Sequence, residues 1–392
     1  MQEIIETYLE KYLPRKDIIH RLPVSLPISK VWPELQKARK DKSESLPLLS
    51  IDGKPFWWVL TENISSQADE VISLARREIV FDRPEYEEAF REAVLDEAVY
   101  SSVIEGAFTT KKEAREFIHE GRSPKNKSEQ MVKNNYEALT YVLEHIDESI
   151  TEQTIFDIYA LVTKDTLEAD VPTNAYRSES VFVQSSRGEI VHTAPEAEKV
   201  SGMMASLLEF ITNNELSPLI KACIAHFYFV YVHPFIDGNG RTARALSFMM
   251  LLQAGYDFFR YFSISGVIAE ERAKYYKAIK DVEDDDFDMT YFIDYYTGML
   301  ARAVKAMEER LVDKVVMEQT LDKLKAAGMN SRVIEGARWI LTSPNQSITI
   351  KAWQKKFGVV LETARQDLFK LEDAGIVHRK LVKRQYVFEV KK

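Results

Sequence analysis

The chain has 392 residues, of which 45% are apolar and 29% charged, a composition typical of globular proteins with substantial hydrophobic cores. A net charge of −9 argues against a protein that binds nucleic acid over its whole surface, and a single cysteine excludes a disulfide framework or a cysteine-rich zinc site. The acidic start and the shortness of the apolar runs predict neither a signal peptide nor a membrane span, so we expect a cytoplasmic protein of two or three domains.

Proline content sets the N-terminal part apart from the rest of the chain. The first 83 residues contain six prolines, and proline at this density interrupts long helices, so we expect residues 1–85 to form an irregular region of short elements. From about residue 86 to residue 312 the apolar spacing is helical. In one such stretch, Phe90, Val94 and Ala98 fall near one face.

One segment inside this helical region has a strand pattern. The sequence SVFVQSSRGEIVHTAP places β-prone residues on both sides of Ser185–Gly188, which predicts a hairpin. Its apolar residues Val181, Val183 and Ile190 suit pairing with an extended segment of another protein by strand addition. A small structural ribbon is the alternative interpretation.

The tail, residues 320–392, changes in character and in charge. Three helical patterns are followed by two strand patterns, the order found in a winged helix-turn-helix domain. Residues 350–392 contain eleven Lys or Arg and five Asp or Glu, a local charge of +6 against −15 for the rest of the chain. DNA contact, protein contact and a solvated basic face all fit this pattern. If the domain binds DNA, the last of the three predicted helices is the candidate recognition helix, and the loop and strands after it form the wing. The residues expected to contact DNA are Thr363, Arg365, Gln366 and Lys370 on that helix, and Arg379, Lys380, Lys383 and Arg384 in the wing.

Between the hairpin and the tail stands the most informative stretch, HPFIDGNGRTAR, which begins at His233. The apolar segment before it predicts a buried helix, and Pro234 turns the chain into a loop. Gly238-Asn239-Gly240 lets backbone N–H groups converge at the start of a second helix, where the helix dipole also favours an anion. Arg241 and Arg244 are three residues apart and therefore share one helix face, from which they can bind phosphates.

Two further residues of this stretch add chemistry to the anion site. Asp237 offers a hard oxygen ligand suited to Mg²⁺, which in proteins takes few carboxylates together with phosphate oxygens. His233 has an ordinary pKa of about 6.5 and can accept a proton at neutral pH. A glycine turn between two helices with solvated charges is the competing interpretation. The combination of residue types favours a Mg²⁺-nucleotide site with a built-in base.

The stretch from His233 to Arg244 resembles the central motif of the Fic family, HPFx(D/E)GNGRxxR, with every defined position filled. The similarity covers roughly residues 85–300. It implies a mainly α fold: a helical Fic core with a β-hairpin flap, to which this chain adds the C-terminal winged helix-turn-helix domain. It also implies a protein adenylyltransferase that moves AMP from ATP to a Ser, Thr or Tyr hydroxyl of a protein substrate.

The resemblance assigns a role to each motif residue. It implies that His233 deprotonates the target hydroxyl, that Asp237 holds Mg²⁺, and that the hairpin clamps the target. It further implies that phosphates meet Gly238, Asn239, Gly240, Arg241 and Arg244, and that adenine lies near Ile279 and Glu283.

A second motif lies upstream. The segment Ser101–Gly106 matches the inhibitory motif (S/T)xxxE(G/N) that one subclass of the family carries on a helix, here at about 88–106. The resemblance implies that Glu105 pairs with Arg244 and so occupies the group that the γ-phosphate needs. In some relatives the same glutamate helps to remove AMP from modified targets. The alternative is an ordinary helix end with Gly106 as its cap.

Other interpretations belong to different classes of protein. A DNA-binding regulator could use the Fic core as a sensor, and related enzymes transfer phosphocholine or phosphate. A homodimer is compatible with the sequence, whereas a membrane partner is not expected. His226, seven residues before His233, suggests a metal ligand or a core histidine, and the missing third ligand favours the core histidine. Cys223 stands in an apolar stretch and is expected to be buried.

Overall fold

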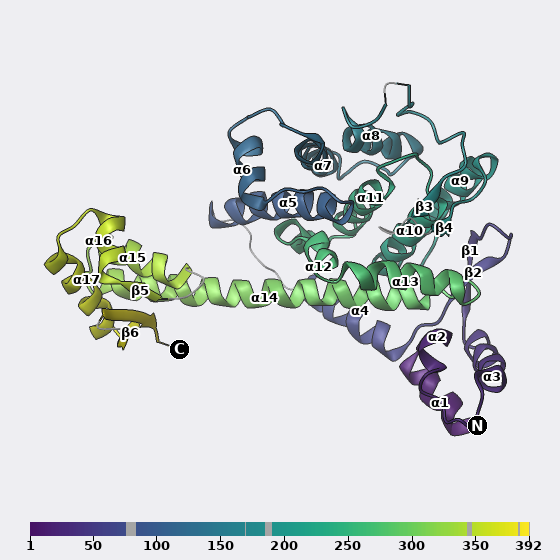
Figure 1. Cartoon of the computed structure of the whole chain (residues 1–392), viewed down its shortest axis with the longest axis horizontal. Coiled ribbons are helices and arrows are strands. Elements are labelled where there is room, and N and C mark those ends of the chain that lie inside the picture. The colour runs from purple at the N-terminus through teal and green to yellow at the C-terminus, as the bar shows by residue number, and fades with distance from the viewer. Residues whose placement is uncertain (76–83, 169, 185–189, 343–346, 383–384, 392) are drawn as a thin grey trace. The chain divides into compact units, whose positions relative to one another are not determined.

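The computed structural model describes residues 1–75, 84–168, 170–184, 190–342, 347–382 and 385–391. The chain is mainly helical and separates into two compact units, Met1–Lys305 and Ala306–Lys392 (Figure 1). Within these described ranges, none of the helices combines the length and the apolar character that crossing a membrane requires.

The N-terminal segment is more regular than its prolines suggest. It consists of α1 (Gln2–Lys11), α2 (Arg15–Ile18), α3 (Ile28–Lys40), β1 (Glu44–Leu49), β2 (Pro55–Trp58) and α4 (Glu62–Ala75). The expectation of irregular structure is wrong here, because α3 continues through Pro33. A proline inside a helix costs about 3 kcal/mol. Burial of Val31, Trp32 and Leu35 offsets this cost, since each large apolar side chain contributes roughly 1.5–3 kcal/mol.

This segment packs with the helical core in one compact unit and is not a separate domain. The buried Arg39 is one of the links: its Nη1 donates to Tyr291 Oη at 2.6 Å. Its Nη2 donates to the carbonyl oxygens of Tyr8 and Leu13 at 3.1 and 3.0 Å. The guanidinium of Arg39, on α3, therefore contacts both α1 and the beginning of α14 (Thr290–Ala326).

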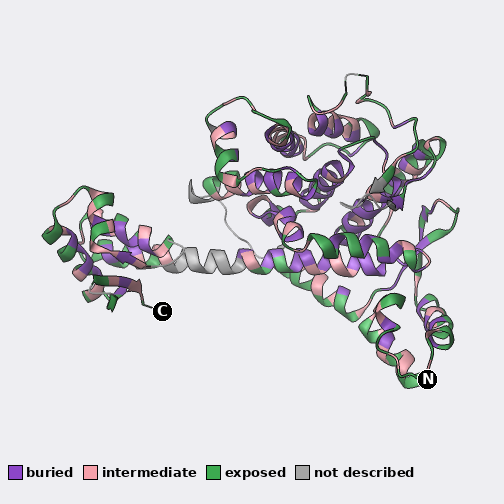
Figure 2. Cartoon of the chain, viewed as in Figure 1, coloured by how far each residue is buried: buried purple, intermediate pink, exposed green. Residues whose placement is uncertain are grey.

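The helical core is built around two helices that are buried on nearly all sides, α10 and α11, which pack against each other (Figure 2). Its helices are α5 (Pro84–Ile104), α6 (Lys111–His119), α7 (Lys127–Glu144), α8 (Glu152–Thr163), α9 (Ala197–Asn213), α10 (Pro218–Val232), α11 (Asn239–Gln253), the 3₁₀ turn η1 (Asp257–Tyr261), α12 (Ile264–Glu270), α13 (Arg272–Asp284) and α14 (Thr290–Ala326). The sequence of α10 is apolar all round, and a helix of this kind is stable in water only inside a protein. Cys223 is buried in it, as expected.

Helix α5 packs against α7 and α12 and carries the upstream motif at its C-terminal end. Val94 and Ala98 are buried, as their helical spacing predicts, and the ring of Phe90 contacts that of Tyr261. Gly106 follows with φ of 92°, a left-handed conformation that favours glycine. The helix therefore ends directly beside Glu105.

The predicted hairpin is present as β3 (Phe182–Gln184) and β4 (Ile190–Thr193), which pair antiparallel with Phe182 opposite Thr193. Its predicted turn, residues 185–188, lies outside the described residues. The hairpin leads into α9 through the buried Ala194.

The C-terminal unit contains α15 (Ser331–Thr342), β5 (Ser347–Thr349), α16 (Ile350–Phe357), α17 (Leu361–Asp373), β6 (Val377–Val382) and β7 (Gln385–Val390). The helices and the last two strands follow the predicted order. The first strand, β5, is an addition, and the antiparallel sheet runs β5-β7-β6. Helix α14 is continuous from Thr290 to Ala326, so the division between the units falls inside a helix and earlier than the predicted boundary near residue 320.

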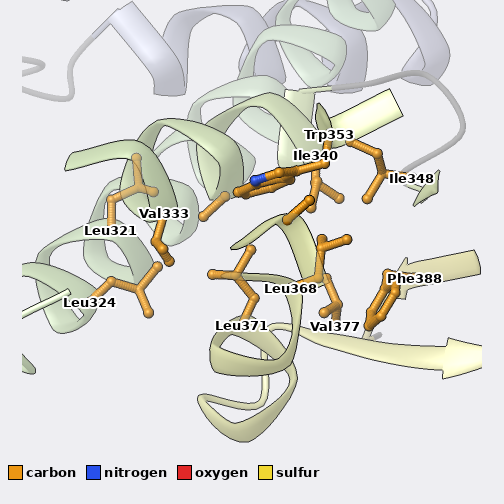
Figure 3. Packing of buried hydrophobic residues seen from close by; sticks show 12 residues of the cluster. Leu321, Leu324, Val333, Ile340, Ile348, Trp353, Leu368, Leu371, Val377 and Phe388 are labelled. Carbon is orange, nitrogen blue, oxygen red and sulfur yellow. The ribbon is translucent and has the colours of Figure 1, made fainter. Parts of the chain in front are cut away.

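Trp353 belongs to this second core, whose buried members include Leu321, Leu324, Ile340 and Leu368 (Figure 3). Its Nε1 donates to Asp367 at 3.1 Å. The sequence of α15 makes room for the indole with Gly336, because a Cβ there would lie 1.8 Å from Trp353 Cη2. The unit therefore has a hydrophobic core of its own.

Candidate active site

The candidate site forms where α10 ends and α11 begins. His233 caps α10 in a left-handed conformation, with φ of 50° and ψ of 58°, and its N–H donates to Phe229 O at 3.0 Å. Pro234 prevents the helix from continuing. The imidazole is thereby held at the point where the chain turns.

The environment of His233 prepares it to act as a base. Its Nδ1 lies 3.2 Å from the carbonyl oxygen of Val230, which can only accept, so Nδ1 carries the proton and Nε2 keeps a free lone pair. Burial lowers the pKa of His233 to about 4. The ring is therefore neutral at neutral pH and can receive a proton at Nε2.

Asn239 closes the loop. Its Oδ1 accepts from Phe235 N at 2.9 Å, and its Nδ2 donates to Phe235 O at 2.7 Å. The side chain of Asn239 thus holds the loop backbone in place. Gly238 has φ of 81°, and a Cβ there would lie 2.7 Å from Thr163 Cγ2, so both conformation and space require glycine.

Asp237 points toward solvent at the mouth of the loop, with 47% of its side chain exposed. Its Oδ1 accepts from Gly238 N at 2.6 Å and lies 3.6 Å from Arg241 Nη2. Among the described residues there is no group of three His, Cys, Asp or Glu side chains that could enclose a metal ion. A single accessible carboxylate still fits Mg²⁺, which is commonly held by one or two carboxylates and substrate phosphates.

Two buried arginines provide the positive charge of the site. Arg241 donates from Nη1 to Val162 O at 2.8 Å, while its Nε and Nη2 have no hydrogen-bond partner among the described residues. The same holds for Nη1 of Arg244. Buried donors without partners are costly, so these groups are suited to an anionic ligand with several oxygens.

The rest of the Arg244 guanidinium is held by α5. Nε donates to Ser101 Oγ at 2.8 Å, and Nη2 donates to Ser101 O at 2.9 Å and to Glu105 Oε1 at 2.8 Å. The carboxylate also fills the space above Gly240, where a Cβ would lie 2.1 Å from Glu105 Oε1. The contact between Glu105 and Arg244 that the family resemblance implies is thus present.

The two residues expected near adenine lie on α13. Ile279 is buried, and Glu283 Oε1 lies 2.8 Å from Nδ1 of His192 on β4. His192 Nε2 is 2.8 Å from Tyr231 O, close to His233 in the chain. In this structure Glu283 therefore connects α13 to the hairpin.

Of the hairpin residues predicted to contact the target, the structure describes some side chains and not others. Val181 is half-buried, and Val183 stands opposite His192 in the strand register. The side chains of Val183 and Ile190 lie outside the described residues. Phe182, which was not among the predicted site residues, is 53% exposed.

Two buried charged residues near the site were not predicted. Among the described residues, the guanidinium of Arg177 donates to backbone carbonyl groups, one of which is His233 O at 2.8 Å. Glu97 on α5 accepts from Ser263 Oγ and Ser265 N at the N-terminus of α12, both at 2.8 Å, and from Ser265 Oγ. Burial raises the pKa of Glu97.

His226 lies on α10 and is buried. Its Nε2 lies 2.9 Å from Tyr275 Oη, and the ring is buried, so the interpretation as a core histidine is confirmed.

The candidate DNA contacts lie on the C-terminal unit. Arg365, Gln366 and Lys370 lie on α17, and Arg379 and Lys380 lie on β6. Arg365, Arg379 and Lys380 are exposed, whereas Thr363 is half-buried. Lys383 and Arg384 lie outside the described residues. Some of these groups are already paired within the unit: Arg365 lies 3.6 Å from Glu362, and Arg379 lies 3.5 Å from Glu372.

Comparisons with known sequences identify proteins to which this chain is similar. Residues 149–251 match the model of the Fic/DOC family. Two curated relatives are named protein adenylyltransferase Fic. The one from Nematostella vectensis is 30% identical over 210 residues, which cover 50% of this chain and 45% of the relative. The one from Drosophila willistoni is 27% identical over 207 residues, which cover 50% and 39%. The chain thus spans less than half the length of these relatives.

Solved structures show the same fold. A Fic family protein from Desulfovibrio desulfuricans G20 matches with a TM-score of 0.56 at 21% identity, over 85% of this chain and 98% of that one. Fic-1 from C. elegans matches with a TM-score of 0.50 at 20% identity, over 63% of this chain and 71% of that one.

Proposed function

Because residues 149–251 match the Fic/DOC family, we propose that this protein is a protein adenylyltransferase. It moves AMP from ATP to a Ser, Thr or Tyr hydroxyl of another protein. The observation that carries the proposal is a neutral imidazole in the same motif as two buried arginines, each of which keeps at least one guanidinium nitrogen without a hydrogen-bond partner among the described residues. A base next to anion-binding donors is what a nucleotidyl transfer to a hydroxyl requires.

His233 starts the reaction as general base. Its free Nε2 accepts the proton of the target hydroxyl, and the oxygen attacks the α-phosphorus of ATP. A bond forms between that oxygen and phosphorus, the bond to the oxygen bridging the α- and β-phosphates breaks, and pyrophosphate leaves. The Nδ1 contact with Val230 O supports this role, because it presents the unprotonated nitrogen.

The arginines bind the leaving group. The free donors of Arg241 and Arg244 would meet oxygens of the β- and γ-phosphates, where charge-assisted hydrogen bonds are strongest. Asp237 would hold Mg²⁺, which neutralises phosphate charge when bound. Backbone groups at Gly238 and Gly240 would complete the phosphate site at the start of α11.

Target and nucleotide binding involve the surrounding elements. The hairpin would pair with an extended target segment through the strands that contain Val181, Val183 and Ile190. The adenine would lie near Ile279 and Glu283, which are four residues apart on α13.

Glu105 keeps the enzyme inhibited. Its carboxylate occupies Nη2 of Arg244 and the space above Gly240, so the γ-phosphate cannot reach its place and the α-phosphate is misaligned. Small errors in alignment cost large factors in rate.

One experiment tests donor, activity and inhibition together. The wild type and Glu105→Gly are incubated with Mg²⁺ and ATP labelled either on the α- or on the γ-phosphate, with His233→Ala as control. Label transferred from the α-position alone supports AMP transfer. Transfer from the γ-position would indicate a phosphotransferase, and release of AMP from a modified target by the wild type would indicate the reverse reaction.

The exposed basic residues of α17 and β6 motivate a second candidate, DNA binding by the C-terminal unit. Binding of the whole protein to duplex DNA that weakens steeply with salt, and weakens again in Arg365→Ala, would support it. Retention of that affinity in Arg365→Ala and Lys380→Ala would argue against it.

A further inference from the structure

We propose that Arg177 is a positioning residue for the transfer step, joining the base of the hairpin to the backbone of the catalytic histidine. The inference rests on the proposed function, since the role of His233 as a base belongs to that proposal. It concerns neither the phosphate site nor the inhibitory contact.

Arg177 bonds to both ends of the hairpin and to the end of α10. Nη1 donates to Glu179 O at 2.7 Å and Nη2 to Pro195 O at 2.5 Å, and these two residues flank the strands. Nε donates to His233 O at 2.8 Å, and Nη2 is also 3.4 Å from Val232 O. One planar group thus sets the spacing between the hairpin and the histidine.

The chemistry of this cluster is unusual for a buried arginine. Only 5% of Arg177 is exposed, burial lowers its pKa, and no ion pair with a carboxylate is present among the described residues. A buried charge of this kind is tolerated because carbonyl oxygens accept from all three nitrogens of the guanidinium. An apolar side chain would fill the same volume at lower cost, so the cluster is better explained by what it holds in place.

Arg177 bonds to the backbone of a strained residue, His233. His233 adopts a left-handed backbone with φ of 50°, which costs energy for any residue with a Cβ and persists only where its surroundings enforce it. The bond from Nε to His233 O, together with that from Arg177 N to Pro234 O at 3.0 Å, fixes the peptide on the C-terminal side of His233. The same guanidinium fixes where the hairpin begins and ends. A target segment bound to the hairpin would therefore present its hydroxyl at a set distance from Nε2.

Lysine is the informative substitution, because it keeps the charge and most of the length but lacks the planar fork. Arg177→Lys is compared with Arg39→Lys, both in the Glu105→Gly protein. Arg39 is a matched control: it is buried, also donates to two backbone carbonyl groups, and belongs to the N-terminal segment, where no candidate site residue lies.

Two measurements are made on each variant. Initial rates of label transfer from ATP labelled on the α-phosphate, measured over a range of ATP concentrations, give kcat and the KM for ATP. Hydrogen exchange is followed in peptides covering residues 190–196 and 233–241. We expect Arg177→Lys to lower kcat roughly ten- to hundredfold with a KM for ATP within about twofold, since only the alignment of the hydroxyl is lost. Both peptides should exchange faster, and neither change should occur in Arg39→Lys.

Three results would overturn the proposal: a kcat no lower than that of Arg39→Lys, a KM for ATP that rises as much as kcat falls, or unchanged exchange in either peptide. If Arg177→Lys does not fold, Arg177→Gln, which can still donate to one carbonyl group, is tested in the same way. Absence of transfer from the Glu105→Gly protein itself would contradict the proposed function. The exchange measurement would then still support or refute the link that Arg177 makes.

Discussion

Replacing Glu105 by glycine removes one contact and leaves the catalytic motif untouched. Glu105 follows the last residue of α5, so glycine at this position does not interrupt the helix. The change releases Nη2 of Arg244 and empties the space above Gly240. The change also removes a negative charge that acts on His233 and Arg241.

The size of the effect follows from the geometry of the ion pair. Oε1 and Nη2 are 2.8 Å apart, and the side chains are 29% and 2% exposed, so the bond is charge-assisted and largely dry. A hydrogen bond of this kind is worth about 1.5–3 kcal/mol. Since about 1.4 kcal/mol corresponds to a factor of ten in rate, Glu105→Gly should raise AMP transfer roughly ten- to hundredfold.

The assay is incorporation of label from ATP labelled on the α-phosphate, into the protein itself or into a target. Glu92→Gly is the control, because Glu92, which lies within α5, is also 29% exposed and is also ion-paired, but to Lys111 and Arg115. Glu105→Gln separates charge from volume: it keeps the size of the side chain and should still activate, although less than glycine.

If folded, monodisperse Glu105→Gly transfers AMP no faster than the wild type, the contact between Glu105 and Arg244 does not inhibit the enzyme. If Glu92→Gly activates equally, the activation comes from loosening of α5 and not from release of Arg244. Arg244→Ala should stay inactive in the presence of Glu105→Gly, since the γ-phosphate would still lack its partner.

The remaining predictions concern the base, the metal and the tail. His233→Ala should abolish transfer without changing the melting temperature by more than a few degrees; retention of near wild-type transfer would refute the assignment of the base. Burial lowers the pKa of His233 to about 4, and the Glu105 carboxylate acts in the opposite direction. The Glu105→Gly rate should therefore be level down to about pH 5 and fall only at about pH 4 or below, and half-loss near pH 6.5 would contradict this. Over the same interval the unfolded chain binds a proton that folded His233 does not, so this residue lowers stability as the pH falls from about 6.5 to 4. Asp237→Ala should raise the Mg²⁺ concentration needed for half-maximal transfer by about tenfold or more, and an unchanged Mg²⁺ titration would remove Asp237 from the site. Deletion of residues 320–392 should spare self-modification, because the compact unit Met1–Lys305 contains the whole candidate site; loss of nucleotide binding on truncation would show that the tail completes the site.

The sequence alone determined those features of the site that depend on neighbours along the chain. The apolar stretch that forms α10 has to be buried because it has no polar face, and Pro234 has to end it. Arg241 and Arg244 share a helix face because they are three residues apart. The resemblance to a known motif added the upstream glutamate, whose pairing with Arg244 spans 139 positions that local spacing cannot bridge.

The prolines led to a wrong prediction for the N-terminal segment, because the sequence does not show which side chains become buried. Proline inside a helix does cost free energy, but in α3 the burial of Trp32 and Leu35 against residues elsewhere in the chain outweighs that cost. Burial also explains why α14 continues across the predicted domain boundary. Leu321 and Leu324, near its C-terminal end, are buried in the same hydrophobic cluster as Trp353.

Only the tertiary structure decided what the unpredicted polar residues do. Arg177 donates to backbone carbonyl groups, among them that of His233, and Glu97 accepts from a backbone amide and from serine hydroxyls on α12 and at its N-terminus. Contacts between such distant segments leave no distinctive spacing in a sequence. The side-chain amide of Asn239 bonds to the backbone of Phe235, a contact that its position in the motif did not reveal. The depressed pKa of His233 likewise comes from burial, which depends on how the surrounding helices pack. Residue types and local spacing specify which groups are available, whereas burial and long-range hydrogen bonds specify their charge, direction and freedom to react.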